Sequence, residues 1–130
     1  MNSDNSRPKI LVAEDEPDIR ELIAIALQFG GFEVEAAADG IEALALAEAK
    51  AFDLIILDVR MPRMTGFEAC RELRLREATR KTPIIFLSAK GQESEVQAGL
   101  DAGADEYIVK PFAPHELAER VRVTLENQPA

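Results

Sequence analysis

The sequence predicts an α/β fold in which five parallel strands and five helices form one doubly wound sandwich. Short apolar runs alternate strictly with segments of helical periodicity, and three of the runs are almost entirely apolar, as strands buried on both faces are. This alternation implies right-handed crossovers that place helices on both faces of the sheet. A chain of 130 residues also suits a single domain.

The strands are assigned from the apolar runs. The first, third and fourth runs are nearly continuous in apolar residues, which is typical of central strands. The second run, FEVEAA, alternates with acidic residues, so we expect it at an edge of the sheet. The five predicted strands cover residues 9–14, 32–37, 53–58, 83–88 and 105–110.

The helices are predicted from apolar residues that recur on one helical face. The first is the clearest, because apolar residues recur from Ile19 to Leu27, Pro17 suits the first helical position, and Gly30 and Gly31 suit the end. The fourth is short and has the weakest pattern. The other four predicted helices cover residues 41–50, 67–77, 94–102 and 114–127.

The domain is expected to cover residues 9–127, between a flexible N-terminal tail at 1–8 and a C-terminal tail at 128–130. The polar start lacks the apolar run of a signal peptide, and no apolar stretch approaches the roughly 20 residues of a membrane span. The single cysteine excludes an internal disulfide. We therefore expect a cytoplasmic protein.

Charge and composition exclude several classes of site. The net charge is −9, which argues against a nucleic-acid surface or a basic membrane-binding face, since both need clustered Lys and Arg. The chain has one histidine, so a metal site built from several histidines is excluded within it. That histidine, His115, and the acids Glu93 and Glu95 are expected at the solvent-exposed surface, whereas Cys70 is expected in the core.

Polar residues stand where four of the predicted strands end. The first strand is followed by Glu14 and Asp15, the third ends at Asp58, the fourth at Ser88 and the fifth at Lys110. If the strand order is the flavodoxin-like 2-1-3-4-5, the first and third strands are neighbours at the switch point where such sheets bind ligands. The five side chains would then form one cluster.

The chemistry of this cluster favours a small metal site. Three carboxylates held together repel each other unless a cation joins them, and Mg2+ prefers oxygen ligands while keeping several waters. An open coordination position beside a lysine and a hydroxyl suits a phosphoryl oxygen. One carboxylate could act as a nucleophile and form an aspartyl phosphate.

The pattern at the strand ends resembles the receiver domain of two-component response regulators, of the chemotaxis-regulator type. The resemblance extends over residues 8–126, and it includes Met61 and Pro62, Gly66, and the stretch GADEYIVKPF at 103–112. It implies that Asp58 accepts a phosphoryl group from a histidine kinase or a phosphotransfer protein, in phosphorelay signalling.

The resemblance also implies the roles of the metal ligands. Asp15 and Asp58 would bind Mg2+ directly, with Mn2+ as an alternative ion. Glu14 would bind it through a water, and the backbone carbonyl of Arg60 would be a further ligand. Lys110 would pair first with the Asp58 carboxylate and then with the phosphoryl group.

A switch is implied as well. Ser88 would hydrogen-bond a phosphoryl oxygen, and Tyr107 would turn inward to fill the space that Ser88 leaves. The Lys110–Pro111 peptide bond is expected to be cis. The surface of the fourth helix, fifth strand and fifth helix would change shape for an unidentified protein partner.

Two basic residues, Arg60 and Lys90, flank the expected phosphoryl site and distinguish this chain. The hypothesis is that they crowd the approach of the attacking water and lengthen the phosphorylated lifetime. The alternative is that Arg60 pairs with Glu14 or Glu16.

Other classes remain as alternatives. A Mg2+-dependent aspartyl-phosphate phosphatase would typically carry an acid where Arg60 stands, and it would have a cap insertion. A flavin or nucleotide carrier would need a glycine-rich phosphate loop after the first strand. A degenerate receiver that only binds proteins would not need the full acidic set with Ser88 and Lys110. The chain is either free-standing or part of a longer regulator, and either a monomer or a phosphorylation-dependent dimer.

Overall fold

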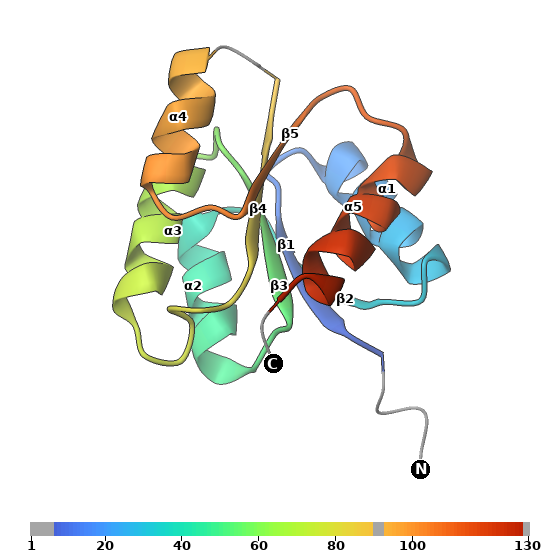
Figure 1. Cartoon of the computed structure of the whole chain (residues 1–130), viewed down its shortest axis with the longest axis horizontal. Helices are drawn as coiled ribbons and strands as arrows, with labels where there is room; N and C mark the ends of the chain where they lie inside the picture. Colours follow the sequence, from blue (N-terminus) through green and yellow to red (C-terminus); the bar gives the residue numbers. More distant parts are fainter. Residues whose placement is uncertain (1–6, 90–92, 129–130) are drawn as a thin grey trace.

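The computed structural model describes residues 7–89 and 93–128 of the chain. They form a parallel five-stranded sheet in the order β2-β1-β3-β4-β5, which confirms the predicted topology. Helices α1 and α5 cover one face of the sheet, and α2, α3 and α4 cover the other (Figure 1). The strands are β1 (Lys9–Ala13), β2 (Glu33–Ala37), β3 (Leu54–Asp58), β4 (Ile84–Ser88) and β5 (Glu106–Val109); the helices are α1 (Pro17–Phe29), α2 (Gly40–Ala49), α3 (Gly66–Leu75), α4 (Glu93–Asp101) and α5 (Pro114–Glu126).

Local sequence signals set the starts of three helices. Pro17 is the first residue of α1, where its missing N–H costs nothing. Asp39 caps α2 with its side chain. Thr65 and Glu68 form a capping box at α3, in which each side chain accepts a hydrogen bond from the other residue's backbone N–H, at 3.1 and 2.9 Å.

β3 and β5 begin later than predicted, because the aspartate at the expected start of each serves as a cap. The carboxylate of Asp53 accepts a hydrogen bond from the Lys9 amide at 2.7 Å. The carboxylate of Asp105 likewise accepts one from the Ile84 amide at 2.9 Å. Each aspartate therefore satisfies the first donor of a neighbouring strand instead of extending its own strand.

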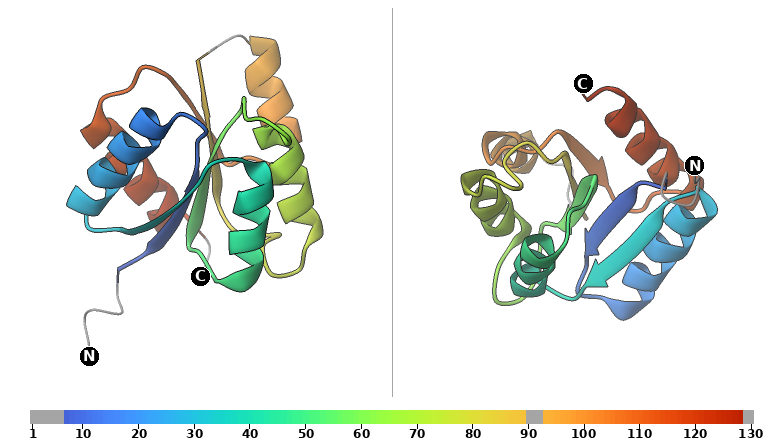
Figure 2. Two further views of the ribbon diagram at one scale, coloured as in Figure 1. Left: turned by 180° about the vertical axis from the view of Figure 1, so that it is seen from behind. Right: turned by 90° about the horizontal axis from the view of Figure 1, so that it is seen from below.

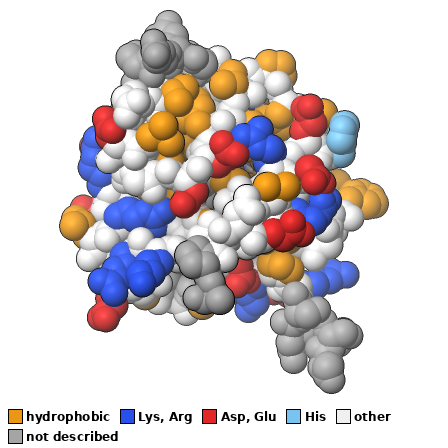
Figure 3. All heavy atoms as spheres, viewed as in Figure 1, with side chains coloured by type: hydrophobic (Ala, Val, Ile, Leu, Met, Phe, Trp, Pro, Cys, Tyr) orange, Lys and Arg blue, Asp and Glu red, His pale blue; other side chains and the backbone are white. Residues whose placement is uncertain are grey.

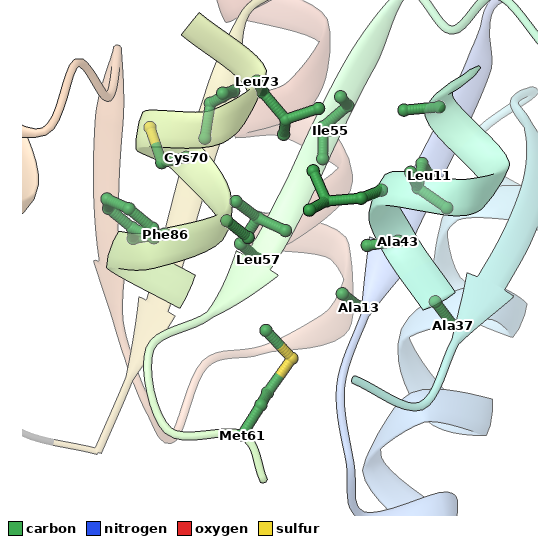
Figure 4. Packing of buried hydrophobic residues seen from close by; sticks show 14 of the residues in the cluster. Leu11, Ala13, Ala37, Ala43, Ile55, Leu57, Met61, Cys70, Leu73 and Phe86 are labelled. Atoms are coloured by element: carbon green, nitrogen blue, oxygen red, sulfur yellow. The ribbon is translucent and has the colours of Figure 1, made fainter. Parts of the chain in front are cut away.

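The core is divided by the sheet into two layers, because alternate residues of a strand point to opposite faces. Ile55 and Leu57 pack with Phe86 on the side of α2 and α3, as Figure 4 shows. Leu54 and Ile56 pack on the side of α1 and α5. Cys70 is fully buried, as expected, and its thiol donates to the Ala102 carbonyl at 3.3 Å.

The carboxyl ends of the strands form one edge of the sheet, the carboxyl edge, and their amino ends form the opposite edge; neither is the lateral edge at β2. The strands run from the edge where β1 begins and α5 ends to the carboxyl edge, where the segments that follow β1, β3 and β5 gather (Figures 1 and 2). The longest described helices, α1 and α5, have 13 residues each, and no described helix is long and apolar enough to cross a membrane. The carboxyl edge holds the site described next.

Candidate phosphoacceptor site

Three carboxylates meet at the carboxyl ends of β1 and β3. Oxygens of Glu14, Asp15 and Asp58 lie within 4.8 Å of one another. Glu14 and Asp58 are buried, whereas Asp15 is partly exposed. The cluster forms because β1 and β3 are hydrogen-bonded neighbours, with Ala13 paired to Leu57 just before the acidic residues. The expected convergence of the three acids is therefore present.

Lys110 reaches the same cluster from the end of β5. Its Nζ lies 2.8 Å from Glu14 Oε1 and 3.4 Å from Asp58 Oδ1. Its backbone N–H donates to the Ser88 carbonyl at 2.7 Å, which fixes the chain as it leaves the sheet. The following peptide bond, Lys110–Pro111, is cis.

Burial and charge shift the protonation equilibria of the cluster. Burial, and then the negative charge of Glu14, raise the pKa of Asp58 to about 7, although Lys110 opposes the shift. Burial alone lowers the pKa of Lys110, but its contacts with Glu14 and Asp58 outweigh burial and raise it. The lysine is therefore cationic at neutral pH, and its ammonium pairs with two of the three acidic side chains, Glu14 and Asp58.

The donor set fits a hard divalent cation. Within residues 7–89 and 93–128, Lys110 is the only side-chain cation paired with the carboxylates of this cluster. Arg20 lies nearby, but its guanidinium donates to the backbone carbonyl of Glu14 at 2.8 Å rather than to a carboxylate. The excess negative charge and the oxygen ligands are what Mg2+ requires.

Glycine allows α3 to begin directly against the acceptor strand. A Cβ at Gly66 would lie 2.3 Å from the Asp58 carbonyl oxygen. The Gly66 amide also donates to the Val59 carbonyl at 2.9 Å, which closes the loop after β3. In the same loop, Arg63 adopts a φ of 68° and pairs with Asp39, the cap of α2. The backbone around Asp58 is thus held from both sides.

The hydroxyls of Ser88 and Tyr107 are directed to a residue that the sequence placed in solvent. Both donate hydrogen bonds to Oε1 of Glu95 in α4. The Glu95 side chain is only 13% exposed, so the expectation of a solvated acid was wrong. Burial and the Glu95 carboxylate raise the pKa of Tyr107 to about 12, which keeps its hydroxyl protonated as a donor.

Arg60 also approaches this acid. One of its guanidinium nitrogens lies 3.9 Å from Glu95 Oε2, whereas the sequence suggested Glu14 or Glu16 as its partner. The Arg60 side chain is 64% exposed, so this ion pair is loose. Lys90, the second basic residue expected beside the site, lies outside the described residues.

Comparisons with known proteins agree with this geometry. The family described as the response regulator receiver domain matches residues 10–122. The response regulator MprA of Mycobacterium sp. is 47% identical over 119 residues, which are 92% of this chain and 51% of that protein. The chain thus spans about half the length of the curated relatives it matches.

Two solved structures are close in fold. The chemotaxis protein CheY4 of Vibrio cholerae superimposes with a TM-score of 0.87 at 41% identity, over 91% of this chain and 98% of that one. The receiver domain of the sensor histidine kinase PA1611 from Pseudomonas aeruginosa gives 0.87 at 35% identity, over 93% and 99%. That structure is described as having a magnesium ion coordinated in its active-site cleft.

Proposed function

The chain belongs to the response regulator receiver domain family, and we propose on that premise that Asp58 accepts a phosphoryl group from the phosphohistidine of a histidine kinase or a phosphotransfer protein. The observation that carries the proposal is the placement of Asp58. It is a buried carboxylate at the switch point of the sheet, between two further carboxylates and the ammonium of Lys110.

In the proposed reaction, an Asp58 carboxylate oxygen attacks the phosphorus atom. A new oxygen–phosphorus bond forms as the nitrogen–phosphorus bond of the phosphohistidine breaks, and the electron pair stays on the imidazole nitrogen. Lys110, which already lies 3.4 Å from Asp58, stabilises the negative charge that arrives with the phosphoryl group. The chain acts as a signalling phosphoacceptor that assists its own phosphorylation.

Glu14, Asp15, Asp58 and the backbone carbonyl of Arg60 would hold a Mg2+ ion, or Mn2+ in its place. When bound, the ion neutralises the crowded carboxylates and offers an open position to a phosphoryl oxygen. The magnesium described in the PA1611 receiver domain, a protein 35% identical to this chain, supports the assignment.

The proposed output is a change in the surface formed by α4, β5 and α5. Acidic, basic and hydrophobic side chains are interspersed over this side of the molecule (Figure 3). Tyr107 of β5 and Ser88 of β4 would transmit the change, and the recipient would be a second protein or a second copy of the chain. The proposed place of action is the cytoplasm.

The decisive experiment is incubation with acetyl phosphate and Mg2+, followed by intact-mass measurement. We expect the mass of one phosphoryl group to be added to the wild type and to the control Asp101→Ala, an exposed acid in α4. Labelling should be lost in Asp58→Ala and in the presence of EDTA. An unlabelled wild type, or labelling that survives Asp58→Ala, would overturn the proposal.

We also propose that Arg60 and Lys90 slow hydrolysis of the aspartyl phosphate by obstructing the attacking water. The exposed position of the Arg60 side chain, in the loop after Asp58, supports its part in this. The test compares the decay of the phosphorylated wild type with that of Arg60→Ala and Lys90→Ala. Faster decay is expected in both variants, and unchanged rates would refute the role.

A further inference from the structure

Glu95 is the meeting point of three segments that surround the acceptor. Its Oε1 accepts hydrogen bonds from Ser88 at the end of β4 and from Tyr107 in β5. Its Oε2 faces Arg60, in the loop after β3, at 3.9 Å. Glu95 itself belongs to α4, so one side chain connects this helix to β4, to β5 and to the loop after β3.

Glu95 is largely buried, so its contacts replace hydrogen bonds that water would otherwise make to the carboxylate. A carboxylate that is 13% exposed loses much of its hydration, and it remains charged only if donors replace the lost water. The two hydroxyls supply that replacement as hydrogen-bond donors. The same charge-assisted hydrogen bonds fix where the hydroxyls of Ser88 and Tyr107 point.

A hydroxyl carries a single proton, and this makes the arrangement a competition. Ser88 donates that proton to Glu95. It cannot donate it to a phosphoryl oxygen on Asp58 at the same time. A chain that uses Ser88 to bind the phosphoryl group must therefore first break the Ser88–Glu95 hydrogen bond.

We propose that Glu95 is a positioning residue that holds the unphosphorylated arrangement by competing with the phosphoryl group for the Ser88 hydroxyl. This inference rests on the proposed phosphoacceptor function. When Ser88 leaves Glu95, the carboxylate loses a donor, and its hold on Tyr107 and on the position of α4 changes. Phosphorylation would in this way be read by a helix that does not contribute a ligand to the acceptor site.

The packing of Tyr107 supports the coupling to α4. Its ring lies edge-on to Phe86, with ring centroids 6.4 Å apart. A Cβ at Gly99 in α4 would lie 3.2 Å from Tyr107 Cδ2 and 2.9 Å from Phe86 Cδ2. Both the ring and the hydroxyl of Tyr107 thus rest on α4, so a shift of the helix and a turn of the ring require each other.

The first test measures the equilibrium directly with beryllofluoride and Mg2+ as a phosphoryl mimic. Removing the competing acceptor should raise the population of the binding-competent state, so we expect the half-saturating concentration to fall by about 3- to 10-fold in Glu95→Ala and by less in Glu95→Gln. The control is Asp101→Asn, which makes the same change of charge at an exposed position of α4 and should not shift the midpoint.

A second readout follows Tyr107 itself. It is the only tyrosine, and the chain has no tryptophan, so intrinsic emission reports on this residue alone. A carboxylate that accepts a hydrogen bond from a tyrosine quenches its emission. We expect brighter emission from Glu95→Gln than from the wild type, and a rise in the wild type on saturation with beryllofluoride. Thermal unfolding of the same samples checks that both proteins are folded.

The outcomes separate this inference from the proposed function. If the wild type neither labels at Asp58 nor binds the mimic, the phosphoacceptor function fails, and unchanged emission in Glu95→Gln would separately refute the Glu95–Tyr107 contact. If the wild type labels normally but Glu95→Ala binds the mimic with unchanged or weaker affinity, the competition is refuted and the function stands. A double-mutant cycle on the half-saturating concentration of beryllofluoride gives a further check. The effects of Glu95→Ala and Tyr107→Phe should be non-additive, because each removes the same hydrogen bond.

Discussion

The carboxyl edge of the sheet and the opposite edge differ in how completely their charged groups are paired. At the carboxyl edge, three carboxylates lie together and one lysine pairs with two of them. At the opposite edge, the guanidinium of Arg74 donates to the carbonyls of Gly103, Thr79 and Thr82 at 2.8, 3.2 and 2.6 Å, and it pairs with Asp105 at 3.1 Å. The first edge has more negative charge than its partners neutralise, whereas the second has donors matched to acceptors.

This difference separates stability from function within one small domain. Arg74 joins the end of α3, the loop before β4 and the loop before β5, so its hydrogen bonds hold three segments together. The carboxylate cluster does the reverse, because the repulsion between its carboxylates costs folding free energy until a cation neutralises them. Removing the Arg74 side chain should therefore destabilise the protein, whereas removing a charged carboxylate from the cluster should stabilise it.

The largest effect is expected from Arg74→Ala. It should lower the free energy of unfolding by about 2–4 kcal/mol, because several carbonyls lose their donor at once. Urea unfolding followed by circular dichroism measures the loss. Arg80→Ala, at an exposed position of the same edge, is the control and should change stability by less than about 0.5 kcal/mol. Equal losses in the two variants would contradict the role given to Arg74.

Gly66→Ala should have the next largest effect, at the functional edge. The new methyl group would collide with the Asp58 carbonyl, so we expect a loss of about 1–3 kcal/mol and slower labelling by acetyl phosphate. The comparison variant is Gly31→Ala. Gly31 has a φ of +97°, but a Cβ added there would have no neighbouring atom within 4 Å. It should lose stability through backbone strain alone and label normally. Slower labelling in both would show a general effect of instability.

Asp58→Asn should stabilise the metal-free protein. Because the folded-state pKa of Asp58 is raised to about 7, the protonated carboxyl costs nothing at low pH, and the penalty grows as pH rises from about 4 through about 7. We expect Asp58→Asn to be more stable than the wild type by about 1–2 kcal/mol above that range, with little difference near pH 4.

Urea unfolding across this pH range, in EDTA, tests that expectation. Added Mg2+ should then narrow the gap by binding the folded wild type preferentially. The sign of the comparison would be wrong if Asp58→Asn were the less stable protein at high pH, or if the difference did not depend on pH.

The smallest effect concerns Cys70, which lies near the Arg74 edge. Burial raises the pKa of its thiol to about 11, so we expect negligible reaction with a thiol reagent at mildly alkaline pH until the protein unfolds. In Arg74→Ala the reaction should accelerate, because the loop that follows α4 is less firmly held. A reaction as slow as that of the wild type would mean that Cys70 stays inaccessible without Arg74, and it would contradict this expectation.

Most of the fold could be predicted because each element carries its own periodic signal. The strict alternation gave the parallel sheet, and the acidic residues in β2 marked it as an edge strand, as the topology confirms. The acids after β1 and β3 could be brought together because strand order alone makes them neighbours. The starts of β3 and β5 could not be predicted from the pattern, because nothing in the sequence shows that the carboxylates of Asp53 and Asp105 accept hydrogen bonds from neighbouring strands.

The contacts of single long side chains could not be predicted in this way. The position of Arg74 in α3 gave no sign that it would reach the carbonyls of two separate loops. Glu95 was misplaced for a similar reason, because an acid in a short, weakly patterned helix is usually solvated, and its burial depends on how α4 packs against β5. The capping box of Thr65 and Glu68, by contrast, is visible in the sequence TGFE.

The closed loop between β3 and α3 has a consequence for how such a chain can diverge. The Gly66 amide bonds to the Val59 carbonyl, and the Val59 amide bonds to the Leu87 carbonyl, both at 2.9 Å. The first hydrogen bond closes residues 59–66 into a ring, a loop of fixed length, and the second attaches that ring to β4. Residues on the ring can be exchanged during evolution, but an insertion or deletion within it would displace either α3 or the acceptor carboxylate. Changes in length should therefore be tolerated elsewhere before they are tolerated here.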